Sequence, residues 1–257
     1  MNPLDDTPRL HGNRQTLSMS FSSSLIQSCM RLDAPDELVL DYTRTMMGAL
    51  LFVPDPVEVL MIGLGGGSML KYMHRHVPSA RLTVVEIHPE VIDLRQSFHI
   101  PPDDARLRVL CDDGAHHVRQ VPPGTFDLIL VDGFDGLGIP DALSTPAFYR
   151  QVRAALSERG LMVANVQSDT RGTGMIRQRI DKAFEGVRLS VESDEGGNEI
   201  MLAFRQAAAL DATLPDLAAR WSSLDAAHRA TLSVCTTRFE RALLNRRRQA
   251  TARQGTP

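Results

Sequence analysis

Short apolar runs alternate with helical patterns between residues 57 and 166, and this alternation constrains the fold more than any other feature. The runs are continuously apolar, as expected of parallel strands that are covered on both faces. Two later runs, 187–193 and 199–204, flank a glycine-rich turn and predict a closing antiparallel hairpin. We therefore expect an α/β fold with a mostly parallel, seven-stranded sheet and flanking helices. The parallel strands are predicted at 57–62, 82–87, 107–111, 126–131 and 161–166.

A glycine-rich turn at 61–68 directly follows the first predicted strand and precedes a predicted helix. Gly63, Gly65 and Gly66 would let the backbone approach a ligand closely, and the helix N-terminus offers N–H groups to it. Alone, the motif fits a dinucleotide-binding fold or merely a tight turn. Ser68 replaces the third small residue of the dinucleotide fingerprint, which disfavours a nicotinamide-dependent oxidoreductase.

One acidic residue closes the second predicted strand and another follows the third. Glu86 comes about 20 residues after the glycine turn, the spacing at which a carboxylate reaches both ribose hydroxyls of a bound nucleoside. Asp113 and Gly114 follow the third strand, where an acid can accept a hydrogen bond from an adenine amino group. Structural interpretations remain open, a helix cap for Glu86 and a turn former for Asp113. Because parallel strands end at one edge of the sheet, we expect a single nucleoside site there.

Two more carboxylates, Asp132 and Asp135, follow the fourth strand and lie three residues apart. At this position they can bind an incoming cation and take its proton. An amine needs such a base, because an alkylammonium group of pKa about 10.4 has no lone pair with which to attack. The structural alternative is that Asp132 caps the next segment and Asp135 faces water.

Composition excludes several classes of protein. A formal net charge of −3 over 257 residues argues against nucleic acid as a partner. No apolar run approaches the roughly 20 residues that a bilayer requires, and the polar N-terminus does not resemble a secretory signal, so we expect a cytoplasmic location and no membrane. The cysteines and histidines lack metal-site spacing, and no metal is expected.

The chain divides into three predicted parts. Residues 1–54 form an N-terminal β-hairpin and helix region, residues 55–206 the nucleoside-binding α/β domain, and residues 207–257 a C-terminal helical extension with a basic tail. The arginines from 238 onward are expected on a solvated helix end. The elements predicted in the first part are strands at 17–21 and 24–30 and a helix at 38–52.

Several of these residues, taken in order, match a known pattern. They are Gln27, Tyr42, the glycine turn, Glu86, Asp113-Gly114 and Asp132-Gly133-Phe134-Asp135. From about residue 25 to residue 204 the chain resembles the spermidine synthase (polyamine aminopropyltransferase) family. The resemblance implies a Rossmann-like fold of the class I methyltransferase type and transfer of an aminopropyl group from decarboxylated S-adenosylmethionine to an amine such as putrescine. It implies no tightly bound cofactor and no metal.

The resemblance also implies roles for individual residues. Asp132 would be the catalytic base, Asp135 would help to hold the acceptor amine, and Tyr42 would line the pocket between donor and acceptor. Homodimers are common in the resembled family, so a homodimer is a further expectation. Donor binding would fall to Gln27, Gly63, Gly65, Gly66, Glu86, Asp113 and Gly114.

Two departures from the family pattern keep other functions open. Gly66 stands where the family has an aspartate that pairs with the donor's terminal ammonium, and its backbone N–H would instead tolerate the carboxylate of intact S-adenosylmethionine. The segment 194–196 lacks the aromatic residue that the family places beside the polyamine. The alternatives are an S-adenosylmethionine-dependent methyltransferase and a non-catalytic nucleoside-binding relative.

Overall fold

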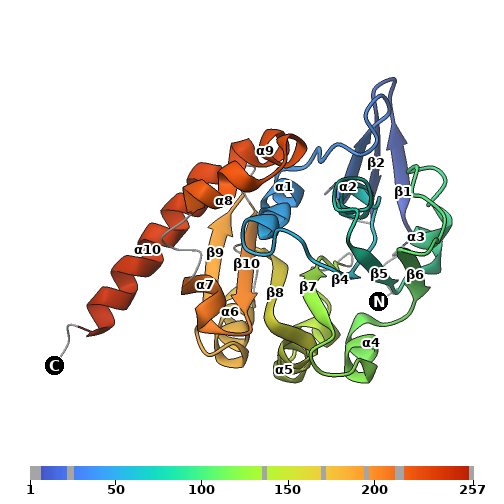
Figure 1. The fold of residues 1–257 in the computed structure, drawn as a ribbon. Helices are drawn as coiled ribbons and strands as arrows, with labels where there is room; N and C mark the ends of the chain where they lie inside the picture. The colour runs from blue at the N-terminus through green and yellow to red at the C-terminus, as the bar shows by residue number, and fades with distance from the viewer. Residues whose placement is uncertain are drawn as a thin grey trace.

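A computed structural model describes residues 7–21, 26–134, 138–168, 172–193, 197–211 and 217–254. Its centre is a seven-stranded sheet in the order β6-β5-β4-β7-β8-β10-β9 (Figure 1). Neighbouring strands from β6 to β8 are parallel, and β10 is antiparallel to both β8 and β9. The predicted α/β fold is therefore confirmed. The strands are β4 (Glu58–Ile62), β5 (Arg81–Glu86), β6 (Leu107–Cys111), β7 (Phe126–Val131), β8 (Leu156–Gln167), β9 (Arg188–Glu192) and β10 (Asn198–Phe204).

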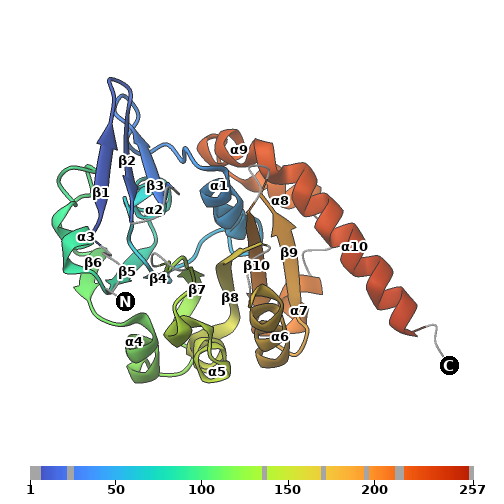
Figure 2. The ribbon, with the colours of Figure 1, turned by 180° about the vertical axis from the view of Figure 1, so that it is seen from behind.

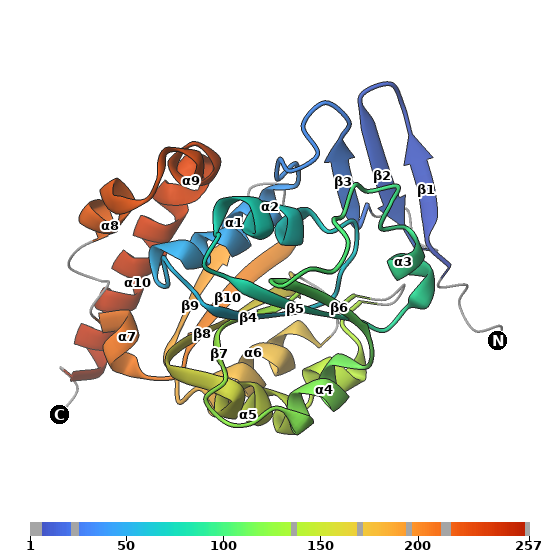
Figure 3. The ribbon, with the colours of Figure 1, turned by 45° about the vertical axis from the view of Figure 1, so that its right-hand side comes forward.

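Side chains on the central strands alternate between two hydrophobic cores, because successive residues of a strand face opposite sides of the sheet. Val59 and Met61 of β4 face one core, and Leu60 and Ile62 face the other. Figure 3 shows α1 and α2 on one side of the sheet and α4, α5 and α6 on the other. Both sides are thus covered, as the continuously apolar runs predict. The helices here are α2 (Ser68–His76), α3 (Pro89–Asp93), α4 (Gly114–Gln120), α5 (Pro146–Ala155) and α6 (Thr173–Ala183).

Helix α6 and the start of β8 differ from the sequence prediction. No element was predicted between 166 and 187, yet α6 lies there, burying Ile180 and Ala183 at helical spacing. Strand β8 begins at Leu156 rather than at residue 161, because Leu156 already pairs with Phe126 across the sheet.

The N-terminal part is a three-stranded antiparallel sheet rather than a hairpin. Strands β2 (Thr16–Ser20) and β3 (Ser28–Arg31) form the predicted hairpin, although residues 22–25 lie outside the described part. Strand β1 (Arg9–Gly12) was not predicted from the sequence. All four of its residues are exposed, so it lacks the alternation that marks a half-buried strand. This sheet stands at one end of the molecule (Figures 1 and 2).

Helix α1 (Asp41–Met47), followed by a 3₁₀ turn at Gly48–Leu51, replaces the longer predicted helix at 38–52. Gly48 lets α10 come close, because a Cβ atom at this position would lie 2.2 Å from the Phe239 ring. Arg238 donates two hydrogen bonds to the buried Asp41 carboxylate and ties α10 to the start of α1.

The C-terminal part is helical, as predicted, and α10 packs along β9 at the far edge of the sheet (Figure 2). The expectation that its arginines are solvated is wrong for Arg238 and for Arg246, which donates to the carbonyl oxygens of Gly186 and Arg188.

One core contains Met19, Met61 and Phe239, which come from all three predicted parts; the boundaries at 54/55 and 206/207 stay predictions. The helices are α7 (Ala207–Asp211), α8 (Leu217–Ser223), α9 (Ala226–Leu232) and α10 (Thr236–Gln254).

Candidate active site

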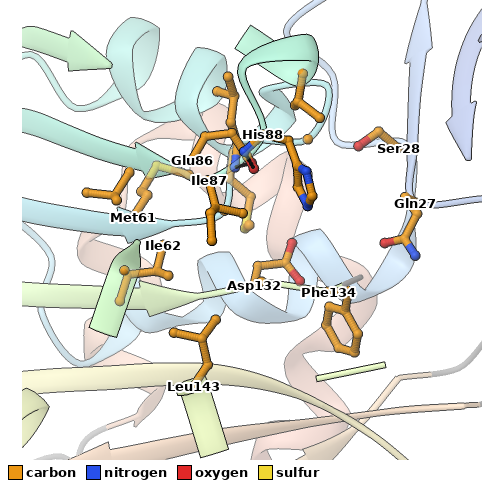
Figure 4. A pocket seen from close by; sticks show the side chains of 18 of the residues that line it. Gln27, Ser28, Met61, Ile62, Glu86, Ile87, His88, Asp132, Phe134 and Leu143 are labelled. Carbon is orange, nitrogen blue, oxygen red and sulfur yellow. Dashed lines mark hydrogen bonds between the residues drawn. The ribbon is translucent and has the colours of Figure 1, made fainter. Parts of the chain in front are cut away.

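One pocket lies at the carboxyl ends of β4, β5, β6 and β7, where open α/β sheets bind ligands. The segment around β2 and β3 and the start of α1 complete its wall. Figure 4 shows the Asp132 and Gln27 side chains pointing into it. Of the sequence-predicted site residues, Gly66 lies behind the wall and Asp135 lies outside the described residues. The predicted residues that line the pocket are Gln27, Tyr42, Gly63, Gly65, Glu86, Asp113, Gly114 and Asp132.

The glycine turn packs closely against β7. Gly63 has a φ of 98°, and a Cβ atom there would lie 2.3 Å from the Asp132 carbonyl oxygen. Any side chain at this position would push the turn away from β7. The glycine therefore lets the glycine-rich turn lie directly against the backbone of Asp132.

Gly66 does not offer its N–H to the pocket, and this corrects the expectation that it would receive a donor carboxylate. The buried Gly66 N–H donates to the Ser28 hydroxyl oxygen at 2.8 Å, which ties β3 to the turn. A Cβ atom at Gly66 would lie 2.9 Å from the Phe98 ring and 3.0 Å from the Ser28 Cβ. In this conformation the position faces the packed interior between β3 and Phe98.

Glu86 is a buried carboxylate held by backbone amides on both sides. Its Oε2 accepts from the Leu64 N–H at 2.8 Å and its Oε1 accepts from the His88 N–H at 3.0 Å. Each carboxylate oxygen can accept more than one hydrogen bond. The arrangement fixes the side chain in the pocket wall and leaves it able to accept from two adjacent hydroxyl groups.

Asp113 caps α4, a structural role that differs from the turn former considered from the sequence. Its Oδ1 accepts from the His116 N–H at 2.8 Å, as an N-cap residue does. Asp113 and Gly114 also line the pocket, as do the apolar side chains of Ile87 and Leu143. The cap uses Oδ1, which leaves Oδ2 as an acceptor for a ligand in the same wall.

Asp132 is held by side chains instead. Tyr42, from α1, places its hydroxyl 3.2 Å from Asp132 Oδ2 and also 3.2 Å from the Gln27 carbonyl oxygen. Asn165, from β8, donates from Nδ2 to Asp132 Oδ1 at 2.8 Å. Burial raises the pKa of Asp132 to about 6, while the hydrogen bonds from Asn165 and Tyr42 oppose that rise. Such a carboxylate is ionised at neutral pH and can still accept a proton.

Sequence reasoning missed two residues at this site. Ser28 and Asn165 contact the glycine turn and Asp132, and each comes from a strand at some distance along the chain. Asn165 had a signal, because it is the one polar residue in the apolar run 161–166. Ser28 had none, because it is one of several serines in its segment.

Within the part of the chain that the structure describes, no three His, Cys, Asp or Glu side chains are grouped as a metal site. None of the helices described there is long and apolar enough to cross a membrane.

A family model named spermine/spermidine synthase domain matches residues 39–191 of this chain. This chain belongs to the spermine/spermidine synthase family. It is 40% identical over 194 residues to a polyamine aminopropyltransferase of Chromobacterium violaceum, covering 75% of this chain and 74% of the relative. The polyamine aminopropyltransferase of Neisseria meningitidis serogroup A is also 40% identical, over 73% of this chain and 72% of that protein. The sequence-based assignment to the family is confirmed.

Solved structures agree on the fold of this synthase-family chain. A probable spermidine synthase from Corynebacterium glutamicum superimposes with a TM-score of 0.69 at 22% identity, covering 84% of each chain. A spermidine synthase in complex with the transition state analogue AdoDATO gives a TM-score of 0.61 at 18% identity, over 88% of each chain. Human methyltransferase-like protein 13, in complex with SAH, gives 0.57 at 20% identity, over 70% of this chain and 92% of that one. The predicted class I methyltransferase-type fold is thus confirmed.

Proposed function

We propose that this chain is an aminopropyltransferase that moves the aminopropyl group of decarboxylated S-adenosylmethionine to an amine such as putrescine. The observation that carries the proposal is Asp132, whose backbone packs against the glycine turn and whose carboxylate lines the pocket, bonded to Tyr42 and Asn165. The named relatives, which are polyamine aminopropyltransferases, support the same reaction.

We assign the donor's adenosine to the wall formed by the ends of β4, β5 and β6. Glu86 would accept hydrogen bonds from the two ribose hydroxyls, since backbone amides hold it with its oxygens in the wall. Asp113 would accept from the adenine amino group, and Ile87 and Leu143 would provide apolar contact with the base. Gln27, Gly63, Gly65 and Gly114 would contribute close contacts to the donor.

We assign the chemistry to Asp132. The amine nitrogen uses its lone pair to form a bond to the aminopropyl carbon attached to the sulfonium. The carbon–sulfur bond breaks, its electrons pass to sulfur, and a neutral thioether nucleoside leaves. Asp132 takes the proton that the amine gives up, and the Tyr42 hydroxyl beside it orients the carboxylate. Asp135 would hold the acceptor amine.

Methyl transfer is the second candidate, favoured by Gly66, which leaves the turn without the family's acid for the donor ammonium. The argument from the Gly66 N–H fails, because the Ser28 hydroxyl already accepts the hydrogen bond that this N–H was to give to a carboxylate. The missing aromatic residue at 194–196 still favours methyl transfer. The names of the relatives also favour aminopropyl transfer.

The test is to incubate the purified protein with decarboxylated or intact S-adenosylmethionine and a panel of amines, and to weigh the products by mass spectrometry. We expect the amine to gain an aminopropyl group, and only with the decarboxylated donor. A methylated product would establish the second candidate. Binding of 5′-methylthioadenosine without any product would establish a non-catalytic relative.

The remaining expectations from the sequence stay predictions. They are a homodimer, a cytoplasmic location, no nucleic-acid or membrane partner, and no tightly bound cofactor.

A further inference from the structure

Two asparagines form a hydrogen-bonded chain that ends at the Asp132 carboxylate. Asn165 Nδ2 donates to Asp132 Oδ1 at 2.8 Å, and Asn198 Nδ2 donates to Asn165 Oδ1 at 2.9 Å. Asn165 is only 4% exposed, within a strand segment whose other residues, 161–166, are apolar and buried. An amide buried in such a strand lowers stability unless its polar atoms are bonded. Both ends of this amide are bonded, and one of them is bonded to the candidate base.

The ionised state of Asp132 determines the direction of this chain. A carboxylate can only accept, so Asn165 must present its NH₂ group to it. The Asn165 carbonyl oxygen then faces Asn198, which must donate in turn. The reverse orientation would set the Asn165 oxygen against a carboxylate oxygen. By donating to the Asn165 oxygen, Asn198 stabilises the orientation of Asn165 that favours the charged form of Asp132.

We propose that Asn165, oriented by Asn198, is a positioning residue that holds Asp132 as a carboxylate with its Oδ2 turned towards Tyr42 and the pocket. The catalytic part of this inference rests on the proposed function, since it treats Asp132 as the base. Neither asparagine needs to touch a substrate to act in this way.

Neutral amides suit a base better than a cation would in this position. Burial alone pushes the pKa of Asp132 up, and an adjacent Arg or Lys would pull it far down and leave a poor proton acceptor. The groups that face the Asp132 carboxylate are Tyr42 from α1 and Asn165 from β8. The other titratable side chains in the pocket lining are Glu86, His88 and Asp113. With neutral donors on both oxygens, the pKa of Asp132 is about 6, so the base is charged but not inert at neutral pH.

The experiment compares Asn165→Ala and Asn198→Ala with wild type by the pH dependence of kcat/KM. We expect the acid limb of the Asn165→Ala profile to move to higher pH by about one unit, because a hydrogen bond to a charged group is lost. Asn198→Ala should move it in the same direction by less, because it only frees the Asn165 amide to turn. Asn245→Ala is the matched control, an exposed asparagine on α10, and should leave the profile unchanged.

A second readout does not depend on turnover. The pKa of Asp132 can be followed by NMR in protein with ¹³C-labelled aspartate, its signal being assigned by its loss in Asp132→Asn. Higher values in both asparagine variants would support the proposal. Unchanged values, in variants whose thermal melts show that they fold, would overturn it.

If wild type transfers no group at all, the proposed function fails while this titration still decides the role of the asparagines. If Asn165→Ala does not fold, Asn198→Ala carries the test, because Asn198 is only half-buried at the start of β10.

Discussion

Glu86 and Asp132 are carboxylates in the wall of one pocket, but the protein holds them in different ways. Backbone amides of neighbouring turns hold Glu86, whereas the side chains of Tyr42 and Asn165 hold Asp132. The bonding partners of Glu86 are 2 and 22 residues away in the sequence. Those of Asp132 are 90 and 33 residues away. The carboxylate assigned to the nucleoside donor is thus positioned by the backbone of nearby turns. The carboxylate assigned as the base is positioned by side chains from distant elements.

This difference matches the two tasks that we propose. A binding group needs fixed acceptors, which backbone amides provide. A base needs a pKa near the working pH, which requires partial burial and a small number of neutral donors. Substitutions should therefore separate the two sides: changes at Asp132 should affect turnover and pH dependence, and changes at Glu86 or Asp113 should affect nucleoside binding.

The largest expected effect belongs to Asp132→Asn. The amide cannot take a proton from the amine, so kcat should fall by about 10²–10⁴-fold, the usual contribution of a general base. Rates of thioether nucleoside release, measured by chromatography, provide the test. Calorimetric binding of 5′-methylthioadenosine should stay within about twofold of wild type. A large loss of binding would instead assign Asp132 to nucleoside binding and would contradict the division of roles between Glu86 and Asp132.

Glu86→Gln should weaken binding of 5′-methylthioadenosine by about 100-fold, or about 2.7 kcal/mol. The glutamine NH₂ group can accept neither from a ribose hydroxyl nor from the backbone N–H that now meets that oxygen. Isothermal titration calorimetry measures the change. Glu90→Gln, an exposed acid at the start of α3, is the matched control and should bind normally. Equal affinities of wild type and Glu86→Gln would contradict the ribose assignment.

Asp132→Asn should also stabilise the fold in a pH-dependent way. The folded-state pKa of Asp132 is about 6, against an ordinary value of 3.8, so the unfolded chain gives up this proton more readily. The contribution of Asp132 to the free energy of unfolding of the wild type therefore falls as the pH rises from about 4 to 6, and it stays at the lower value above pH 6. We expect the variant to be more stable than wild type by about 1–2 kcal/mol at pH 8, but not at pH 4. Urea unfolding at both pH values tests this, and an equal difference at the two would refute it.

Asp113→Asn should have the smallest effect and separates two roles of one side chain. Asparagine still caps α4 through its oxygen, so the melting temperature should barely change. Its NH₂ group would face the adenine amino group, and binding of 5′-methylthioadenosine should weaken about tenfold, or about 1.4 kcal/mol. Asp225→Asn changes an equivalent cap on α9, outside the pocket, and should not alter binding. Normal binding by Asp113→Asn would restrict Asp113 to capping.

The sequence predicted most of the residues in the pocket wall that we assign to the nucleoside donor, but few of those that surround Asp132. Glycine turns and acids that follow strands are visible in a sequence, because each depends on its own strand and turn. Asn198 lies in a strand that was predicted, yet nothing in the sequence indicated that its amide reaches Asn165 on the neighbouring strand. The interpretation of Gly66 failed for a similar reason, since its N–H partner is Ser28 on a separate sheet. The roles of Asp135 and of residues 194–196 stay predictions, because these residues lie outside the described part.

The sequence by itself determined the parallel sheet and the positions of Gly63, Glu86, Asp113 and Asp132 at its carboxyl edge. The reason is that apolar periodicity sets the strands, and every parallel strand ends at the same edge. Only the tertiary structure decided the environment of the Asp132 carboxylate. Its burial and its neutral hydrogen-bond donors arise when α1 and β8 pack around β7, and a pKa depends on those surroundings rather than on the residue type alone.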